Sequence, residues 1–429
     1  MMHVLLVLSL LGLTTSTIYT LLVVSGALHF AQRRRTAEPH EFTPPVSLLK
    51  PLHGLEQGLE FRLESFFRQE YPRFEILFCA RSDQDPALSV AMSVAARYRH
   101  IPTKFLACGE PPYANAKVWS LEHMQRASEH KILVISDSDV SVTPDYLRAV
   151  VAPFADDRIG LVTCLYRGVA LSPTTAKNCS FWSCLEAVGM SVEMSSGVLL
   201  ADMLEGMKFA LGPTMVVRRD CLEHAGGFTA IGEHHGDDFI LGKLVAAHGR
   251  KVLLSTHAIE HHILNTSFVS SARHQIRWMR GTRFYRPKGH AGTVLTFSTP
   301  YGLLAGVVAL SAHRPLLAAL FVAWSWATRV ALAALVGGFV VREPDLWRNA
   351  LLYPLRDLLG FFFWSASYLG KQVVWRGEVY ELLRGGLMRR RIPTVPASTS
   401  SISPLPPVGS LGLGRPACTD SSQTYGLPT

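Results

Sequence analysis

The N-terminal apolar stretch most constrains what this chain can fold into. No Asp, Glu, Lys or Arg occurs from His3 to Ala31, and Arg33, Arg34 and Arg35 come soon after. A run of about 20 apolar residues is long enough to cross a bilayer. A secretory signal peptide carries its positive charge before the apolar run, whereas here the charge follows it. The sequence therefore predicts a retained transmembrane anchor over residues 1–32.

Three more apolar stretches lie in the C-terminal third of the chain, at residues 293–312, 315–341 and about 351–369. We predict that residues 293–370 form transmembrane helices, which makes the chain a multi-pass integral membrane protein. Ionisable residues are costly inside a membrane and usually face a partner. Arg329 inside the second stretch is therefore expected to face a partner or lipid headgroups, and Arg356 and Asp357 interrupt the start of the third stretch.

The positive-inside rule sets the expected orientation, with the catalytic domain facing the cytoplasm next to Arg33–Arg35. If every apolar stretch crosses the membrane, the basic membrane-proximal segment 371–392 lies outside, which the same rule disfavours. A re-entrant third hairpin would remove this conflict, so the C-terminal topology stays open. Residues 393–429 are rich in Ser, Pro, Gly and Thr and are predicted to be disordered.

Composition narrows the class of protein. Only 17 % of the residues are charged, against about 25 % in soluble domains. The basic residues gather beside the apolar stretches and not along one face with interleaved aromatic residues, so we expect no nucleic-acid partner. The seven cysteines include no CxxC pair. We expect them to be reduced thiols, Cys179 and Cys184 among them, with no disulfide framework.

The middle of the chain, residues 42–287, alternates short β-rich runs with helical patterns. The runs expected as strands are 46–49, 75–80, 104–107 and 132–135, separated by helices at about 59–67, 86–97 and 117–127. This alternation predicts an α/β domain with a mainly parallel sheet covered on both faces. Ligands of such sheets bind beyond the carboxyl ends of the strands.

Acidic residues follow the predicted strands. Asp137 and Asp139 come after the strand at 132–135, and two residues apart in extended chain they point to the same side, as a hard divalent cation requires. A solvated turn is the alternative. Asp85 precedes Pro86 and could simply be a helix N-cap. The Asp237-Asp238 pair begins a helical pattern, where the helix dipole favours carboxylates, although one of them could serve as a general base.

Two further segments allow two interpretations each. Arg277 and Trp278, with Arg280 and Arg283, either anchor the chain to anionic lipid or bind an anionic substrate. Residues 181–217 are nearly uncharged and rich in Met and Leu. They either lie among acyl chains at the membrane interface or form ordinary core.

Together these motifs resemble those of inverting glycosyltransferases of the family-2/21 type, and more narrowly ceramide glucosyltransferases and their bacterial relatives that act on hopanoids. The resemblance runs from about residue 46 to residue 382. It is carried by Ser47-Leu48-Leu49-Lys50-Pro51-Leu52, Asp85-Pro86, Asn115-Ala116-Lys117, Asp137-Ser138, Gly226-Gly227, Asp237-Asp238-Phe239, Ile276-Arg277-Trp278 and Trp375-Arg376. It implies a GT-A-like nucleotide-diphospho-sugar transferase domain.

The resemblance also implies roles for individual residues. Asp85 would bind the uridine, Asn115 and Lys117 would lie close to the nucleotide, and Asp137 and Asp139 would hold the sugar diphosphate through Mg²⁺ or Mn²⁺. Asp238 would be the catalytic base, and Arg277 and Trp278 would close on the diphosphate and the acceptor. The family's last motif begins with Gln or Arg, where this chain has His274. Histidine can still donate a hydrogen bond to phosphate, but its charge depends on pH.

The activity that the resemblance implies is transfer of a sugar from a UDP-sugar donor to a membrane lipid. Glucose as the sugar and ceramide as the acceptor are favoured, which would give a β-glycolipid. The alternatives are a UDP-N-acetylglucosamine transferase acting on a hopanoid polyol and a non-catalytic lipid-binding scaffold. Intact acids at Asp85, Asp137, Asp139 and Asp238 disfavour the scaffold.

Overall fold

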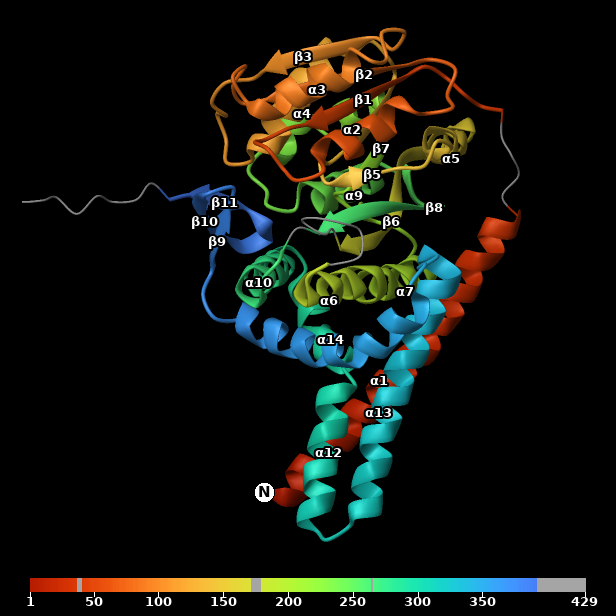
Figure 1. Ribbon diagram of the computed structural model, residues 1–429, viewed down its shortest axis with the longest axis vertical. Helices are drawn as coiled ribbons and strands as arrows, with labels where there is room; N and C mark the ends of the chain where they lie inside the picture. Colours follow the sequence, from red (N-terminus) through yellow and green to blue (C-terminus); the bar gives the residue numbers. More distant parts are fainter. Residues whose placement is uncertain (37–40, 171–178, 264, 392–429) are drawn as a thin grey trace, which may run out of the picture. The chain divides into compact units, whose positions relative to one another are not determined.

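An eight-stranded sheet organises the middle of the chain in the computed structural model (Figure 1), which describes residues 1–36, 41–170, 179–263 and 265–391. The strand order is β3-β2-β1-β4-β7-β6-β8-β5. The strands are β1 (Val46–Pro51), β2 (Phe74–Ala80), β3 (Thr103–Ala107), β4 (Ile132–Ser136), β5 (Val140–Ser141), β6 (Ile159–Ala170), β7 (Thr214–Arg218) and β8 (Lys251–Ile263).

The sheet is mixed, whereas the sequence predicted a mainly parallel one. Strands β3, β2, β1 and β4 are parallel to one another, and β1, β2 and β4 are buried along their whole length, as their continuous apolar runs suggest. Strand β7 lies antiparallel to both β4 and β6, because the chain enters it from the opposite end of the sheet after a long helical segment. The predicted strands stopped at residue 135, so the prediction covered only the parallel half.

Short capped helices connect these strands. Asp85 caps α3 by accepting from the Ala87 N–H at 2.9 Å, and Asn115 caps α4 by accepting from the Val118 N–H at 3.2 Å. The helices of this domain are α2 (Leu59–Phe67), α3 (Pro86–Ala95), α4 (Ala116–Ala127), α5 (Tyr146–Val151), α8 (Arg219–His224), α9 (Asp237–Ala247), α10 (Phe268–Tyr285) and α11 (Pro287–Gly292), with 3₁₀ turns η1 (Ala152–Ala155) and η3 (Phe228–Ile231).

The apolar segment after residue 180 forms a layer between the sheet and the helices below it. It comprises α6 (Phe181–Gly189), a π-helical turn η2 (Met190–Met194) and α7 (Ser195–Glu205), and it passes under β6 in Figure 1. Leu185, Val198 and Leu199 are buried. Of the two interpretations that the sequence allowed, the structure favours core for most of this segment; Phe181 and Leu204 at its ends remain exposed.

The helices that carry the long apolar stretches are α1 (Met2–Thr36), η4 (Thr293–Thr296) with α12 (Thr299–Ser311), and α13 (Pro315–Leu335) continued by η5 (Val336–Val341). In the described part of the chain, three helices are long and apolar enough to cross a membrane, or four if α11–η4 and α12, bent by 46°, form one span. One of these, Phe181–Glu205, has 78 % of its most apolar stretch buried inside the protein.

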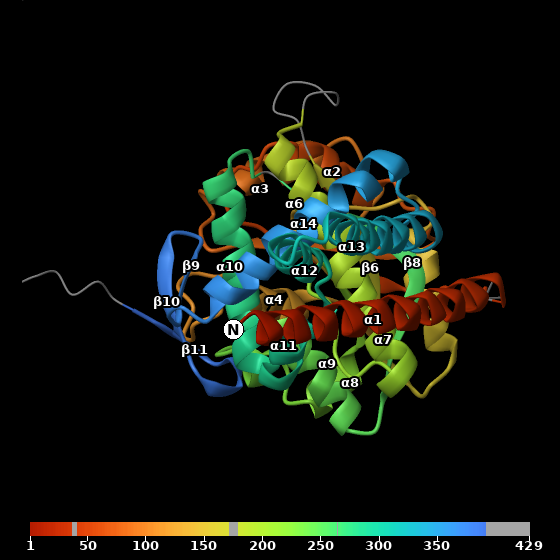
Figure 2. The same ribbon diagram turned by 90° about the horizontal axis from the view of Figure 1, so that it is seen from below.

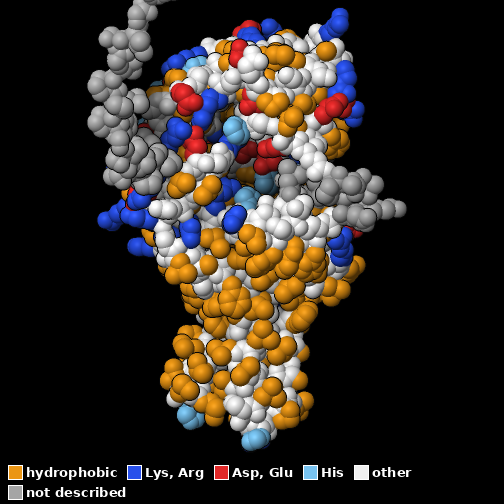
Figure 3. Space-filling view, turned by 60° about the vertical axis from the view of Figure 1, so that its left-hand side comes forward, with side chains coloured by type: hydrophobic (Ala, Val, Ile, Leu, Met, Phe, Trp, Pro, Cys, Tyr) orange, Lys and Arg blue, Asp and Glu red, His pale blue; other side chains and the backbone are white. Residues whose placement is uncertain are grey.

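Helices α1, α12 and α13 pack through small residues. A Cβ atom at Gly12 would lie 2.3 Å from the ring of Tyr301, and one at Gly302 would lie 2.1 Å from the Ser325 Oγ. Such close contacts are typical of helices that associate in lipid. The outer faces of these helices are apolar and form the lower part of the surface in Figure 3.

Helix α14 (Leu346–Ser367), expected as a third C-terminal crossing, runs across the upper ends of α12 and α13, beneath the sheet domain (Figures 1 and 2). Its charged residues explain this position. Arg356 pairs with Glu193 at 2.8 Å, and Asp357 pairs with Arg329 at 3.5 Å. Arg329 therefore faces a partner within the protein, one of the two possibilities that the sequence left open.

The basic segment 371–392 folds, over its described residues, into a three-stranded sheet of β9 (Gln372–Trp375), β10 (Glu378–Leu382) and β11 (Met388–Arg390), with the 3₁₀ turn η6 (Arg384–Gly386). This sheet docks on the loop before α9, where the Met388 N–H donates to the Glu233 carbonyl at 2.8 Å. The C-terminal sheet therefore lies on the same side of the apolar helices as the main sheet, which removes the conflict between charge and crossing number. The tail predicted to be disordered, 393–429, lies outside the described residues.

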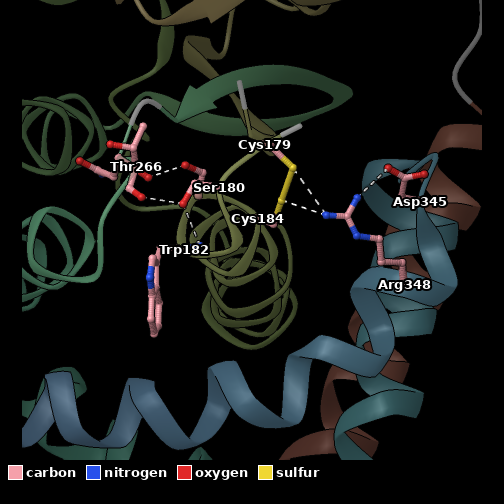
Figure 4. The surroundings of a disulfide bond; sticks show 9 residues. Cys179, Ser180, Trp182, Cys184, Thr266, Asp345 and Arg348 are labelled. Carbon is pink, nitrogen blue, oxygen red and sulfur yellow. Dashed lines mark hydrogen bonds and ion pairs between the residues drawn. A yellow bond between two sulfur atoms is a disulfide. The ribbon is translucent and has the colours of Figure 1, made fainter. Parts of the chain in front are cut away.

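Cys179 and Cys184 form a disulfide (Figure 4), so the prediction that they are reduced thiols was wrong. Ser180 caps α6 by accepting from the Trp182 N–H, which sets Cys179 just before the helix and brings its side chain over Cys184 in the first turn. Arg348 of α14 donates to the Cys184 Sγ at 3.0 Å. The other described cysteines, Cys79, Cys108, Cys164 and Cys221, are free and buried, as expected.

Candidate active site

The acidic motifs predicted after the strands meet at one edge of the sheet. Asp137 follows β4, and Asp237 begins α9. Lys117 from the first turn of α4 connects them, because its Nζ lies 2.6 Å from an Asp137 carboxylate oxygen and 3.6 Å from one of Asp237. Figure 3 shows this edge as a hollow in which acidic, basic and histidine side chains gather above the apolar surface.

Asp139 has the strongest acid character in the cluster. Burial favours its neutral form, but His261, whose Nε2 lies 3.1 Å from the carboxylate, together with Arg62 and Lys50, holds the pKa of Asp139 well below its usual value. The Asp139 Oδ1 is buried, and no described group donates a hydrogen bond to it. An ionised carboxylate with an unused buried oxygen suits a hard divalent cation.

The residues present fit Mg²⁺ or Mn²⁺ only in part. In the described part of the chain no group of three or more His, Cys, Asp or Glu side chains has the arrangement of a complete metal site. Asp137 and Asp139 supply carboxylate oxygens, and Mg²⁺ in proteins is usually completed by waters and substrate phosphate oxygens. The pair therefore fits a cation that binds together with a diphosphate.

Asp238 differs from its neighbour Asp237. Burial, and next the Asp237 charge, raise the pKa of Asp238 to about 7. The Phe239 N–H donates to the Asp238 Oδ1 at 2.8 Å, and no described cation forms an ion pair with this carboxylate. A carboxylate that titrates near neutral pH is suited to general-base catalysis.

Two buried cations hold the backbone of the Asp137-Ser138-Asp139 turn. Lys50 at the end of β1 donates to the Asp137 carbonyl at 2.5 Å, and Arg62 of α2 donates to the Ser138 carbonyl at 2.9 Å. Burial lowers the pKa of Lys50 to about 7. Sequence analysis assigned neither cation a role at the site. The available signal was a lysine inside an apolar strand, since unpaired lysines are almost never fully buried.

Asp85 and Asn115 lie at the edge of the site as helix caps. Asp85 also accepts from the Gly54 N–H at 2.9 Å, and Asn115 donates to the His234 carbonyl at 2.9 Å. A solvent-open pocket lies between the first turn of α4 and the C-terminal sheet. Its lining includes His53, Arg81, Lys117, Trp119, Trp375 and Arg376. The side chains of Asp85 and Asn115 are already engaged in these hydrogen bonds, and neither residue lines the pocket.

Helix α10 supplies Arg277, Trp278 and His274. The His274 Nδ1 donates to the buried Glu186 carboxylate at 2.5 Å, and the His274 ring lies 4.9 Å from the Trp278 ring. Glu186 also accepts from Ser271 and Asn265, so it fixes the start of α10. Sequence analysis assigned Glu186 no role, because its partners lie some 80 residues away along the chain.

Arg277 faces the acidic cluster without a direct partner. Burial, and next the charge of Arg376, lower the pKa of Arg277 to about 10, whereas Asp139 and Glu186 raise it. None of the described residues forms an ion pair or hydrogen bond with its guanidinium group. The structure thus brings together Lys117, Asp137, Asp139, Asp238 and Arg277, with His274 and Trp278 beside them, and adds His261.

Comparison with known proteins identifies the family. Residues 4–388 match the model described as Glycosyl transferase family 21. The chain belongs to this family. The α/β domain of GT-A type and the glycosyltransferase identity that the resemblance implied are confirmed.

Relatives of this family 21 glycosyltransferase include two from Caenorhabditis elegans. Ceramide glucosyltransferase 1 is 24 % identical over 385 residues, covering 87 % of this chain and 79 % of the relative. Ceramide glucosyltransferase 3 is 23 % identical over 351 residues, covering 80 % and 74 %. Among solved structures, mannosyltransferase PcManGT from Pyrobaculum calidifontis, in complex with GDP-Man and Mn²⁺, aligns with a TM-score of 0.48 and 16 % identity, covering 84 % of this chain and 99 % of that chain.

Proposed function

We propose that this protein is an inverting glycosyltransferase that moves glucose from UDP-glucose to the hydroxyl of ceramide and forms a β-glycolipid. The observation that carries the proposal is Asp238, a half-buried carboxylate at the start of α9 whose pKa is raised to about 7 and which interacts electrostatically with Asp237, Lys117 and Asp137. The ceramide glucosyltransferases among its relatives support the choice of donor and acceptor.

Asp137 and Asp139 would hold Mg²⁺ or Mn²⁺, with the remaining positions left to phosphate oxygens and water. When bound, the cation would neutralise negative charge on the diphosphate leaving group. Arg277 contributes a second positive charge at the same place, because its guanidinium faces Asp139 without an ion pair of its own. Lys117 keeps Asp137 and Asp237 together.

Asp238 performs the proton transfer. Its carboxylate takes the proton from the lipid hydroxyl while the hydroxyl oxygen attacks the anomeric carbon of the sugar. The bond from that carbon to the diphosphate oxygen breaks in the same displacement, so UDP leaves and the anomeric configuration inverts. A single displacement of this kind uses no nucleophilic residue and forms no covalent intermediate.

The acceptor would approach from the apolar surface below the hollow. Phe181 at the start of α6 and Phe268 and Val269 at the start of α10 are exposed, and Trp182 lies 4.9 Å from the ring of Phe268. Phe268 and Val269 lie about one and a half turns before His274 on α10. Lipid chains packed against them would bring a headgroup hydroxyl toward Trp278 and the acidic cluster.

The orientation that fits this reaction puts the catalytic domain on the cytoplasmic face. Arg33–Arg35 at the end of α1 and Arg280, Arg283 and Arg286 near the end of α10 lie at the domain end of the apolar helices. The positive-inside rule favours the cytoplasm for such a side.

The test is UDP release by the purified protein in lipid nanodiscs with Mg²⁺ or Mn²⁺, using three UDP-sugars with and without ceramide. We expect release with UDP-glucose, stimulated by ceramide and abolished by a chelator. Release stimulated by a hopanoid polyol and not by ceramide would overturn the acceptor. UDP binding without release from any donor would support a non-catalytic lipid-binding protein.

The matched variants are Asp238→Asn and Asp220→Asn. Both aspartates accept a hydrogen bond from the next backbone N–H at 2.8 Å, but Asp220 is exposed on α8, away from the cluster. We expect Asp238→Asn to lose at least about 100-fold in transfer while keeping most UDP binding. Equal loss of transfer and UDP binding would contradict the base assignment, and Asp220→Asn should change neither.

A further inference from the structure

The turn between β9 and β10 has an unusual backbone. Trp375 pairs with Glu378 across it, which leaves a two-residue loop of Arg376 and Gly377, with φ angles of 50° and 80°. Two positive φ values define a type I′ turn, whose first position favours Asn, Asp or Gly. An arginine held there is strained, and such strain persists where the surroundings enforce it, often at functional sites.

The surroundings hold this turn rigidly. Glu378 pairs with Arg81 of the main domain at 3.2 Å and with Arg390 of β11 at 2.7 Å. Arg280 of α10 donates to the Gln372 carbonyl at 2.7 Å. Figure 2 shows the C-terminal sheet beside α10. Arg280, next to the membrane helices, therefore holds the C-terminal sheet in place. The position of the turn between β9 and β10 is fixed by these contacts.

Arg376 at that tip lines the same pocket as Lys117. Arg376 keeps an exposed surface at this solvent-open pocket. Desolvation by the surrounding protein lowers the pKa of its guanidinium group, and the acids that oppose this effect are Asp137, Glu56, Asp139 and Asp85, in that order. The Arg376 guanidinium group, at the open side of the pocket, therefore interacts electrostatically with the acidic cluster. Within the described part of the chain it forms no ion pair and no hydrogen bond.

Arg376 and Arg277 are two interacting cations, and no described carboxylate forms an ion pair with either of them. The charge of Arg376 is the second cause of the lowered pKa of Arg277, so the two guanidinium groups share one electrostatic environment. Like charges held together in this way repel each other, and a multiply charged anion between them would remove that cost. Guanidinium groups bind phosphate oxygens in a planar, two-pronged geometry.

We infer that Arg376 binds the diphosphate of the donor nucleotide opposite Arg277, so that the C-terminal sheet completes the donor site. This inference rests on the proposed function, because it takes the donor to be a nucleoside diphosphate sugar. It gives the C-terminal sheet a role in binding the donor that family membership alone does not assign. It also gives a reason for an arginine at a turn position that favours glycine.

The test compares binding of UDP and uridine by calorimetry to the full-length protein in nanodiscs with Mg²⁺. The variant Arg376→Gly removes the guanidinium and relaxes the turn, so the C-terminal sheet should stay folded. Arg389→Ala removes an equal charge from an exposed position on β11 and serves as the control. We expect Arg376→Gly to weaken UDP binding roughly 10- to 100-fold and to leave uridine binding within about twofold.

The outcomes separate this inference from the proposed function. If the wild-type protein binds UDP and Arg376→Gly binds it equally well, the role of Arg376 is wrong while the proposed function stands. Equal weakening of UDP and uridine would also overturn it, because the residue would then only shape the pocket. If the wild-type protein binds no UDP at all, the proposed function fails and this inference fails with it.

Discussion

At the scale of single residues, the two adjacent carboxylates at the start of α9 have different surroundings. Asp237 has Lys117 at 3.6 Å and Asn115 at 3.5 Å, whereas Asp238 has only the Phe239 N–H as a close partner. Burial and the neighbouring Asp237 raise the pKa of Asp238 to about 7. One carboxylate therefore holds the site together, and the other is left to exchange a proton.

This difference predicts how the activity depends on pH. The base acts only as the carboxylate, which is the minor form below a pKa of about 7 and the major form above it. The turnover rate at saturating substrates should therefore rise as the pH increases through about 7 and level off above it. The measurement is the turnover rate at saturating substrates from about pH 5.5 to about pH 9, a range that brackets the transition. A rate that stays constant or falls over this range would contradict the assignment.

His274 provides a second prediction at this scale. Its Nδ1 donates to the Glu186 carboxylate, so that nitrogen is not free for phosphate. Gln, which the resemblance places at this position, can make the same donation. We expect His274→Gln to keep the thermal unfolding midpoint, and Glu186→Gln, which turns an acceptor into a donor facing Asn265, Ser271 and His274, to cost about 1–3 kcal/mol. A His274→Gln variant as unstable as Glu186→Gln would contradict this role.

The sequence predicted some site residues and missed others for a definable reason. Asp137, Asp139 and Asp238 were found because their spacing at strand and helix ends is local. Arg376, Arg62 and Glu186 were not assigned to the site, since each acts on residues more than 70 positions away. For Asp85 the sequence offered a cap or a ligand role, and for Asn115 only a position close to the nucleotide. The structure shows both as helix caps.

At the scale of elements, α12, α13 and α14 are joined by one buried ion pair. The Arg329 guanidinium of α13 lies 3.5 Å from Asp357 of α14, and it donates to the Thr296 carbonyl at 2.9 Å. The other Asp357 oxygen accepts from the Ser298 and Thr299 N–H groups at the start of α12. Asp357 thus acts as the N-terminal cap of a neighbouring helix as well as a counterion.

Removing this carboxylate should destabilise the helical assembly strongly. Asp357→Asn leaves Arg329 buried without a counterion, for which a loss of roughly 3–5 kcal/mol is typical. Asp345→Asn is the control, because its pair with Arg348 is exposed and surface pairs contribute about 1 kcal/mol or less. Thermal unfolding in detergent micelles should show a lower midpoint for Asp357→Asn alone. Equal midpoints for the two variants would contradict the structural role of the pair.

The prediction of elements succeeded where one pattern decides the outcome. The strands up to 135 and the long apolar helices have unmistakable periodicity or length. Helix α14 and the C-terminal sheet could not be placed, because an apolar helix with Arg356 and Asp357 spans or lies flat depending on which partners reach those charges. Those partners, Glu193 and Arg329, belong to other helices.

At the scale of the whole described chain, a single membrane topology accounts for what lies at each end of the apolar helices. The N-terminus and the turn between α12 and α13 lie at the end of the apolar helices away from the sheet (Figure 1). The Ser311 Oγ donates to the Met2 Sδ at 3.2 Å, which agrees with this arrangement. The chain would cross once through α1, cross out through α12 and return through α13, so the C-terminal sheet comes back to the domain side.

This topology predicts which sites an impermeant thiol reagent reaches in intact cells. Arg314→Cys lies in the turn between α12 and α13 and should react from outside, whereas Arg389→Cys on β11 should react only after permeabilisation. Among the described residues the free cysteines Cys79, Cys108, Cys164 and Cys221 are buried and should react little. Cys418 lies outside the described residues, so both variants are made in a Cys418→Ser chain. Reaction of both variants from outside would put the C-terminal sheet and the turn between α12 and α13 on the same side of the membrane, which would contradict this topology. Reversed labelling of both sites would instead leave the fold intact and contradict the cytoplasmic orientation of the domain.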